Sequence, residues 1–284
     1  MFKYGISCSL EPQPVRQPVI IRGEIEYVAD QVRKAGYDAI ELFIRDPKQY
    51  DPARLVKAAA DEELEFCAIS TGMEFTRNGL CLISDDAANR QQAVDRLKEH
   101  IELGAAIGSP VVVGIMRGSI PDFEREDLYL GYYREALALL CDYAKEKGVK
   151  IYVESIMRYI NNYLNSVPET AAFLRGMNKD NLFLHIDTHS MAIEDHDEYN
   201  SVKNAADIIG YVHFSDNNRG YPGAGNVDFK TIMRALYDAG YNGYISTECT
   251  PYPTEFDCAK RGLDYMKALE TIISIEAAPM MAQG

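Results

Sequence analysis

Four side chains of the kinds that bind divalent cations recur at regular intervals in the second half of the chain. Glu154 follows the apolar run IYV, Asp187 follows LHI, His213 follows YV and Glu248 follows IST. Three carboxylates and one imidazole, brought together, could hold a metal ion or exchange protons with a bound substrate. Each is separated from the next by about one strand and one helix. Chemistry at a single point therefore requires a fold that gathers successive strand ends.

Eight β-rich runs supply such strand ends. Most are continuous in hydrophobicity, which is typical of parallel strands that helices cover on both faces. Helical periodicity occupies the intervals, most clearly over 85–107, over 127–147 and after residue 228, with Ser84 and Asp228 as expected N-caps. The runs are KYGISCS (3–9), YDAIELFI (37–44), EFCAIST (65–71), PVVVGIM (110–116), VKIYVESI (149–156), NLFLHIDT (181–188), IGYVHFSD (209–216) and GYISTECT (243–250).

This alternation permits either an open doubly wound sheet or a closed barrel. An open nucleotide-binding sheet usually carries a glycine-rich turn after its first strand, and none follows KYGISCS. The segment PGAG (222–225) does not match a phosphate-binding loop. We therefore predict a (β/α)8 TIM barrel. Because no linker rich in Pro, Gly or Ser divides the chain, we expect a single TIM-barrel domain over 1–284 with a frayed tail over 277–284.

A TIM barrel builds its active site at the carboxyl ends of its strands, so the four side chains should converge there. Three clustered carboxylates repel one another unless a cation balances them. We therefore predict one divalent metal on Glu154, Asp187, His213 and Glu248. This donor set suits Mn²⁺, Mg²⁺ or Co²⁺, and we expect Mn²⁺ first. Singly, each residue could instead cap a helix or be a satisfied polar group, and it is the set of four that favours the metal.

Composition narrows the range of partners. A formal net charge of −14 opposes binding to phosphate backbones, so we do not expect a nucleic-acid partner. No run approaches the roughly 18 apolar residues of a membrane span, and the N-terminus MFKYGISCSL lacks the pattern of an export signal. The six cysteines are scattered, as in proteins with reduced thiols. We therefore expect a cytoplasmic protein that does not bind membranes.

The segments around these residues resemble the sugar phosphate isomerase/epimerase superfamily of xylose isomerase-like barrels, most closely the ketose 3-epimerases related to D-tagatose 3-epimerase. The similarity covers nearly the whole chain, and its specific parts are VESIMRY (153–159), HIDTHSM (185–191), VHFSDNNRGYPGAGNVDF (212–229) and ISTECT (245–250). It implies that Glu154, Asp187, His213 and Glu248 bind the metal. It also implies that Glu154 and Glu248 are the acid–base pair, that Arg219 contacts the substrate and that the protein is a homodimer or homotetramer.

Two departures from the family pattern concern the substrate. Family members usually carry a histidine three residues after the metal aspartate, where this chain has Ser190. His189 precedes it, and both a substrate contact and a packing role stay open for that residue. Many ketose 3-epimerases also read Glu-x-x-Asn-Arg-x-Glu on the fifth strand, where Met157 and Ile160 replace the asparagine and the second glutamate. Arg158 remains and is a candidate substrate contact.

These features predict a metal-dependent isomerase or epimerase of a small ketose or ketose phosphate, with C3 epimerisation expected. One glutamate removes a proton beside the carbonyl, the metal stabilises the enediolate, and the other glutamate returns a proton to the opposite face. A metal-dependent lyase or deglycosylase of a keto-glycoside is an alternative, and so is a non-catalytic sugar-binding protein. An abasic-site endonuclease of the same superfamily would need more histidine ligands and a basic face. The chain has only five histidines and a net charge of −14, which oppose this function.

Overall fold

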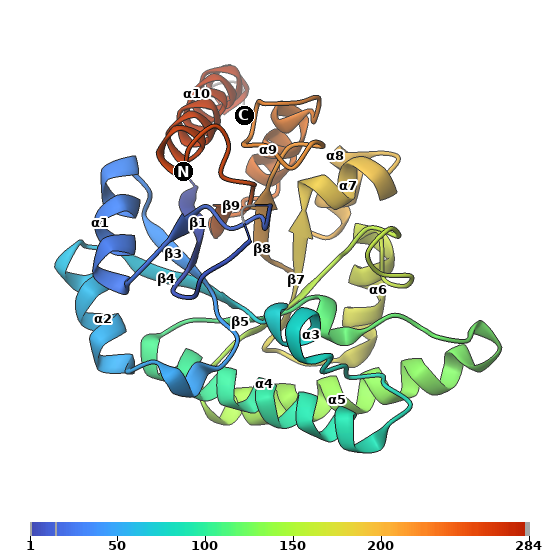
Figure 1. Ribbon diagram of the computed structural model, residues 1–284. Helices are drawn as coiled ribbons and strands as arrows, with labels where there is room; N and C mark the ends of the chain where they lie inside the picture. The colour runs from blue at the N-terminus through green and yellow to red at the C-terminus, as the bar shows by residue number, and fades with distance from the viewer. Residues whose placement is uncertain (1, 15, 282–284) are drawn as a thin grey trace.

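Eight parallel strands close into a barrel, with helices on its outside (Figure 1). The computed structural model describes residues 2–14 and 16–281. Pairing of the first strand with the last closes the sheet, so the predicted (β/α)8 TIM barrel is confirmed. The barrel strands are β1 (Lys3–Ser9), β3 (Ala39–Phe43), β4 (Glu65–Ser70), β5 (Val111–Val113), β6 (Ile151–Glu154), β7 (Leu182–Asp187), β8 (Ile209–Phe214) and β9 (Tyr244–Thr247).

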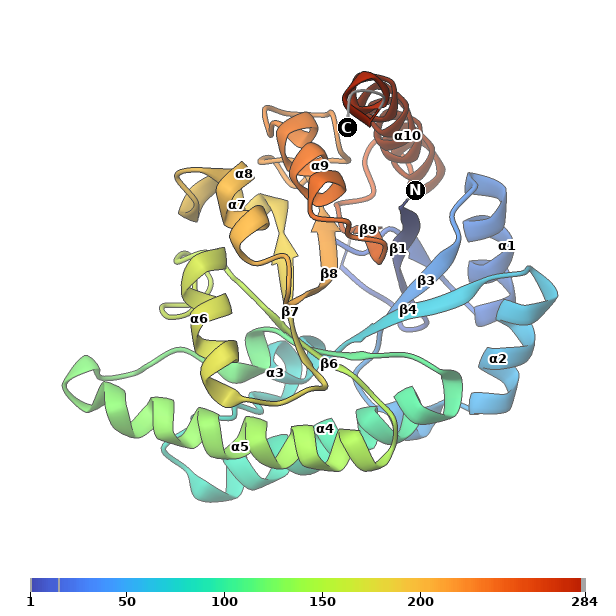
Figure 2. The ribbon, with the colours of Figure 1, turned by 180° about the vertical axis from the view of Figure 1, so that it is seen from behind.

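The helices surround this barrel and cover its outer face (Figure 2). Helix α9 shows the pattern, because Phe229, Ile232 and Leu236 are buried along one of its faces. The helices are α1 (Ile25–Ala35), α2 (Pro52–Asp61), α3 (Met73–Asn78), α4 (Ala87–Ile107), α5 (Glu126–Glu146), α6 (Val167–Met177), α7 (Thr188–Glu194), α8 (Glu198–Asn204), α9 (Phe229–Asp238) and α10 (Glu255–Met281), with short 3₁₀ turns at η1 (Pro47–Gln49), η2 (Ile115–Arg117) and η3 (Phe123–Arg125).

One of the two predicted N-caps is correct and the other is displaced. Asp228 caps α9, because its Oδ1 accepts from the Thr231 amide at 3.1 Å. Helix α4 is capped by Asp86, whose Oδ1 accepts from the Ala88 amide at 2.9 Å. Ser84 lies two residues too early, and its hydroxyl accepts from the Asp86 amide at 3.2 Å. The prediction of this helix is therefore confirmed, but its predicted N-cap is wrong by two residues.

A short strand that the sequence analysis did not include, β2 (Ile21–Arg22), adjoins the carboxyl end of β1. The amino-terminal part of β1 pairs with β9, and Cys8 and Ser9 at its other end pair with β2. This pairing anchors the segment that precedes β2. Several residues of that segment line the cavity of the candidate active site.

The barrel interior changes from apolar to polar along its axis. Inward-facing side chains alternate with outward-facing ones, so a residue and the one two positions later share a face. Ala39 is followed in this way by Glu41, and Tyr211 by His213. Toward the amino-terminal end, Ala39 and Tyr211 belong to an apolar cluster, whereas Glu41 and His213 are buried polar residues. The polar side chains inside the barrel therefore lie toward the carboxyl ends of these strands.

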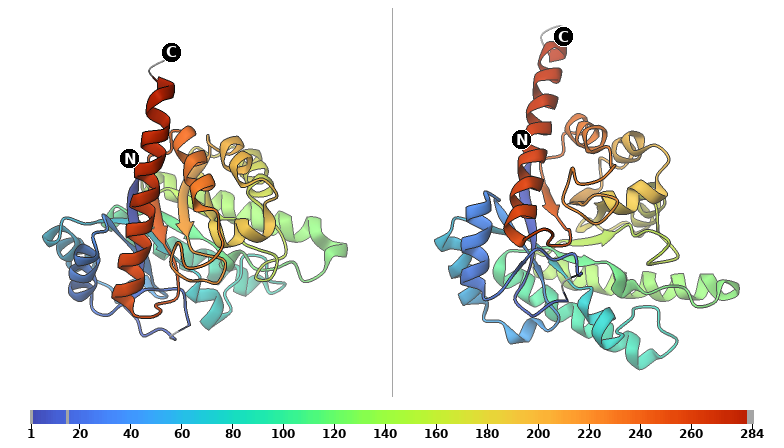
Figure 3. Two further views of the ribbon diagram at one scale, coloured as in Figure 1. Left: turned by 90° about the horizontal axis from the view of Figure 1, so that it is seen from above. Right: turned by 45° about the horizontal axis from the view of Figure 1, so that its top comes forward.

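Helix α10 continues to Met281 and extends beyond the barrel (Figure 3). The tail predicted to fray over 277–284 is thus helical as far as Met281, and residues 282–284 lie outside the described residues. Within the described part of the chain, no helix combines the length and the apolar character that crossing a bilayer requires.

Candidate active site

The ends of four successive strands bring the predicted ligands to one cavity of about 920 Å³. Glu154 and Asp187 are the last residues of β6 and β7, His213 lies near the end of β8, and Glu248 directly follows β9. Asp187, His213 and Glu248 are buried, and Glu154 is only partly exposed. Four donor side chains therefore line the same buried part of the molecule, as the strand spacing predicted.

Two residues that follow β5, Gly114 and Arg117 of η2, contact Glu154. A Cβ on Gly114 would lie 2.6 Å from Glu154 Oε2, so only glycine leaves room for this carboxylate. Arg117 is fully buried and donates to the carbonyl oxygens of Glu154, Tyr163 and Leu164. These hydrogen bonds tie the end of β6 to the loop that follows it and hold Glu154 in place.

His213 is oriented by a carboxylate that the sequence analysis did not include. Its Nε2 lies 2.8 and 2.9 Å from the two oxygens of Glu41, so Nε2 donates to Glu41 and Nδ1 is the nitrogen that could bind a metal once it has lost its proton. Nδ1 is buried without a hydrogen-bond partner, 3.5 Å from Glu248 Oε2. Burial lowers the pKa of His213, but Glu41 and Glu248 outweigh burial and keep the pKa well above its ordinary value. A carboxylate behind an imidazole is the usual support of a metal-binding histidine.

Arg219 lies between two of the predicted ligands. Its Nη1 is 2.7 Å from Glu248 Oε2 and 3.3 Å from Asp187 Oδ2. The sequence analysis treated Arg219 as a substrate contact and assigned the balancing charge to a metal alone. The structure shows that this guanidinium already supplies one positive charge to the carboxylates.

Asp216 organises the loop that presents Arg219. Its carboxylate accepts from the amides of Gly223 at 3.1 Å, Gly225 at 2.6 Å and Val227 at 3.0 Å. A Cβ on Gly225 would approach Asp216 Oδ1 to 2.4 Å, which explains the glycine. Arg219 itself adopts a left-handed backbone with φ of 57°. The loop is therefore closed on itself by one buried side chain.

The charges of the site drive the pKa values of its two glutamates apart. Burial and the neighbouring Glu248 carboxylate raise the pKa of Glu154 to about 8. Burial also raises the pKa of Glu248, but Arg219 and His213 outweigh burial and bring this pKa below its ordinary value. Near neutral pH the protein's own charges thus favour a protonated Glu154 and an ionised Glu248. Two carboxyls with separated pKa values can act as acid and base in one reaction.

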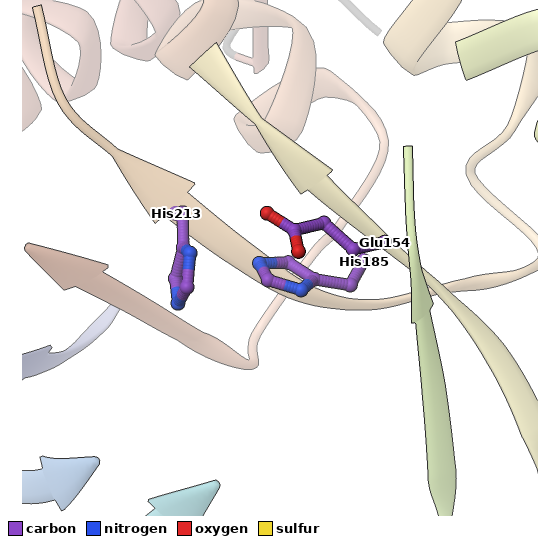
Figure 4. A group of neighbouring side chains, drawn as sticks. All are labelled: Glu154, His185 and His213. Atoms are coloured by element: carbon purple, nitrogen blue, oxygen red, sulfur yellow. The ribbon is translucent and has the colours of Figure 1, made fainter. Parts of the chain in front are cut away.

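His185 is a further imidazole beside the predicted ligands. Glu154, His185 and His213 each offer one ligand atom, and the three atoms lie within 4.8 Å of one another (Figure 4). The His185 ring is fully buried, and among the described residues neither of its nitrogens finds a hydrogen-bond partner. Burial lowers the pKa of His185 well below its ordinary value, and His213 adds to this effect. A neutral, unpartnered imidazole of this kind can bind a cation or a water molecule.

The predicted substrate contacts separate into two groups. His189 lines the cavity, and its Nδ1 donates to the Asp216 carbonyl oxygen at 3.1 Å, so Nε2 remains as an acceptor. Ser190 also lines the cavity, and its hydroxyl accepts from the Met157 amide at 3.2 Å. Arg158 is not among the residues that line the cavity.

Arg158 instead pairs with a carboxylate on a neighbouring helix. Its Nη2 lies 2.6 Å from Oε2 of Glu194 in α7, and its side chain is 64% exposed. The resemblance to the ketose 3-epimerases made Arg158 a candidate substrate contact, because this arginine remains from the family pattern on the fifth strand. Glu194 draws the guanidinium away, so the structure does not bring Arg158 into the site.

The sequence analysis did not include Arg117, Glu41, His185 or Asp216, which are buried at the site, and for two of these residues the sequence holds a signal. Glu41 interrupts the apolar run AIELF, and a lone carboxylate in a buried strand needs a partner. His185 stands two residues before Asp187, which puts both on one face of β7. Asp216 has no such signal, because its partners are amides of a loop whose path only the structure shows.

Comparison with known proteins shows the family of the chain. A family model described as xylose isomerase-like TIM barrel matches residues 29–269. L-ribulose 3-epimerase of Mesorhizobium japonicum is 34% identical over 230 residues, which are 80% of this chain and 76% of that protein.

Two solved structures are similar to the chain in both fold and sequence. A structure of L-ribulose 3-epimerase superposes with a TM-score of 0.84 at 28% identity and covers 99% of this chain and 98% of its own. D-allulose 3-epimerase from Methylomonas sp., in complex with D-allulose, gives a TM-score of 0.80 at 27% identity over 94% of this chain and 96% of its own. The barrel is closed, and the polar side chains of the site lie at the carboxyl ends of β6 to β9. Because the family model also matches most of its length, the chain belongs to the xylose isomerase-like TIM barrel family.

Proposed function

We propose that the protein is a metal-dependent epimerase of a small ketose or ketose phosphate and that it inverts C3. The observation that carries this proposal is the pair of Glu154 and Glu248, which line one cavity with opposite shifts in pKa. Similarity to L-ribulose 3-epimerase and D-allulose 3-epimerase supports the choice of a ketose and of C3. The remaining proposals are a single domain over 1–284, a homodimer or homotetramer, and a cytoplasmic location.

The side chains present fit a divalent cation. His213 Nδ1 is buried without a partner, and the carboxylates of Glu154, Asp187 and Glu248 line the same cavity. We propose that these four residues hold one ion, with Mn²⁺ expected and Mg²⁺ or Co²⁺ as alternatives. When bound, the ion would withdraw electron density from the substrate carbonyl and so acidify the adjacent carbon.

The two glutamates then divide the proton transfers between them. One of Glu154 and Glu248 removes the proton from C3, and the other delivers a proton to the opposite face. The reverse reaction exchanges the two roles. His189 Nε2 and the Arg219 guanidinium are placed to bind substrate oxygens from the wall of the cavity.

Incubation with ketoses in deuterium oxide tests the reaction itself. With Mn²⁺ present, we expect a 3-epimer that carries solvent deuterium at C3, because a protonated glutamate exchanges before it returns its proton. Chromatography and mass spectrometry measure both. An epimer without deuterium would contradict the two-glutamate scheme and indicate internal hydride transfer. Release of an aglycone from a keto-glycoside, without epimerisation, would favour the deglycosylase alternative.

Glu41 provides a test of the metal site that does not require turnover. Glu41→Gln is expected to weaken Mn²⁺ binding by roughly tenfold to a hundredfold, as is usual when the carboxylate behind a metal-binding histidine is lost. Titration followed by electron paramagnetic resonance measures the dissociation constant. Glu65→Gln is the matched control, because this exposed glutamate pairs with Lys3 at the other end of the barrel. Equal affinity in the two variants would show that His213 does not bind the metal.

A further inference from the structure

The outer part of the active-site cavity carries two arginines. Arg16 lies in the segment between β1 and β2, and Arg77 lies in α3. Both side chains line the cavity that contains Glu154 and Glu248. Both residues are exposed, whereas Glu248 is buried and Glu154 is only partly exposed. The arginines therefore border the cavity on its solvent side.

In the described part of the chain, neither arginine is paired with a carboxylate. Nη2 of Arg77 donates to the Pro12 carbonyl oxygen at 3.2 Å and to Gln13 Oε1 at 3.3 Å, which joins α3 to the segment that carries Arg16. Within residues 2–14 and 16–281, no carboxylate forms an ion pair with Arg16 or Arg77. Other exposed arginines do have such partners, and Arg33 lies 2.8 Å from Glu63.

The charges of the residues that line the cavity indicate what kind of group the two arginines bind. Its acidic lining residues are Glu154, Asp187 and Glu248, all of which belong to the proposed metal site. A divalent ion together with Arg219 balances these three carboxylates. Arg16 and Arg77 then give the cavity a positive charge, although the whole chain carries −14. A positive cleft in a negative protein attracts an anion that the cleft is shaped to receive.

The size of the cavity is consistent with a substrate that reaches both regions. Its volume of about 920 Å³ lies near the upper end of the roughly 300–1,000 Å³ typical of sites for drug-sized ligands. Gln17 and Thr76, which lie next to the arginines in sequence, also line the cavity and add polar side chains to it. There is thus room and polarity for a substituent beyond the carbons that react.

We propose that Arg16 and Arg77 bind an anionic group, a phosphate ester or a carboxylate, at the end of the ketose remote from the metal. A guanidinium presents two parallel N–H groups that match the oxygens of either anion. This inference rests on the proposed function and names the substrate class as anionic ketoses. The two arginines are specificity residues and take no part in proton transfer.

Three substrates of equal carbon skeleton test this inference with the Mn²⁺-loaded protein. They are a free ketohexose, its terminal phosphate ester, and the ketohexuronate whose terminal carbon is a carboxylate. We expect kcat/KM to be roughly tenfold to a hundredfold higher for an anionic form than for the free sugar, mostly through KM, because charged hydrogen bonds are lost with the free sugar. The better of the two anions identifies the group, and added salt should reduce the preference.

The double variant Arg16→Gln/Arg77→Gln connects the preference to these residues. We expect the ratio of kcat/KM between the anionic and the free ketose to fall at least tenfold in this variant. Arg33→Gln, on the outer face of α1, is the matched control and should leave the ratio unchanged. Equal use of free and anionic ketoses, or a preference that survives the double variant, would overturn the inference and leave the proposed epimerase intact. Absence of epimerisation with every substrate, with metal bound, would overturn the proposed function itself.

Discussion

Replacing Glu154 or Glu248 by glutamine is expected to lower the rate of ketose epimerisation by roughly a hundredfold to ten-thousandfold, the loss typical when a general acid or base is removed. Inversion at one carbon requires a proton to leave on one face and another to arrive on the opposite face. Each glutamate serves one face, so neither can replace the other. Steady-state rates of the variants at saturating Mn²⁺ measure this loss.

Because both glutamates are also proposed metal ligands, the metal content of each variant must be measured with its rate. Glu65→Gln, at the amino-terminal end of the barrel, is the matched control and should retain full activity, since an exposed ion pair contributes little. A variant that retains metal and one glutamate is expected to exchange hydrogen for solvent deuterium in one epimer more than in the other. Full epimerisation by metal-loaded Glu154→Gln or Glu248→Gln would contradict the assignment of the acid–base pair.

Removal of the metal is expected to reduce epimerisation by roughly a thousandfold or more, since a Lewis acid on the carbonyl supplies several kcal/mol of stabilisation. Protein treated with a chelator and then dialysed should regain its activity with Mn²⁺, at about one ion per chain. Asp187→Asn should weaken Mn²⁺ binding, because Asp187 is a proposed ligand without a proposed proton-transfer role. Undiminished epimerisation by metal-free protein would exclude the proposed mechanism.

The same metal-loaded protein shows which imidazoles take part. If the ligands are Glu154, Asp187, His213 and Glu248, pulsed paramagnetic resonance of bound Mn²⁺ should detect one directly bound histidine nitrogen. His185 lies within reach of the same ion, and a second nitrogen that disappears in His185→Phe would show that it is a ligand too. The proposed set of four ligands contains one histidine and therefore predicts one bound nitrogen. A second histidine ligand would leave fewer coordination positions on the metal for the substrate.

The elements that form the barrel were predictable because their signals are local. Runs such as 37–44 and 181–188 contain β3 and β7, since a strand buried on both faces is mostly apolar. The ends of elements were less well determined. The run 110–116 is a strand only over Val111–Val113, because the chain bends at Gly114 and continues as η2. Helix α4 is capped by Asp86 and not by the predicted Ser84, because several polar residues in this segment could serve as the cap.

The sequence by itself determined which side chains stand at the ends of β6 to β9, because strand spacing and the barrel rule place Glu154, Asp187, His213 and Glu248 at one end of the fold. Only the tertiary structure decided how these side chains are held and charged. Glu41 meets His213 across 172 residues of sequence, and Arg219 reaches Glu248 from a loop. Such contacts depend on barrel closure and on the paths of loops, and a local pattern of residues contains neither.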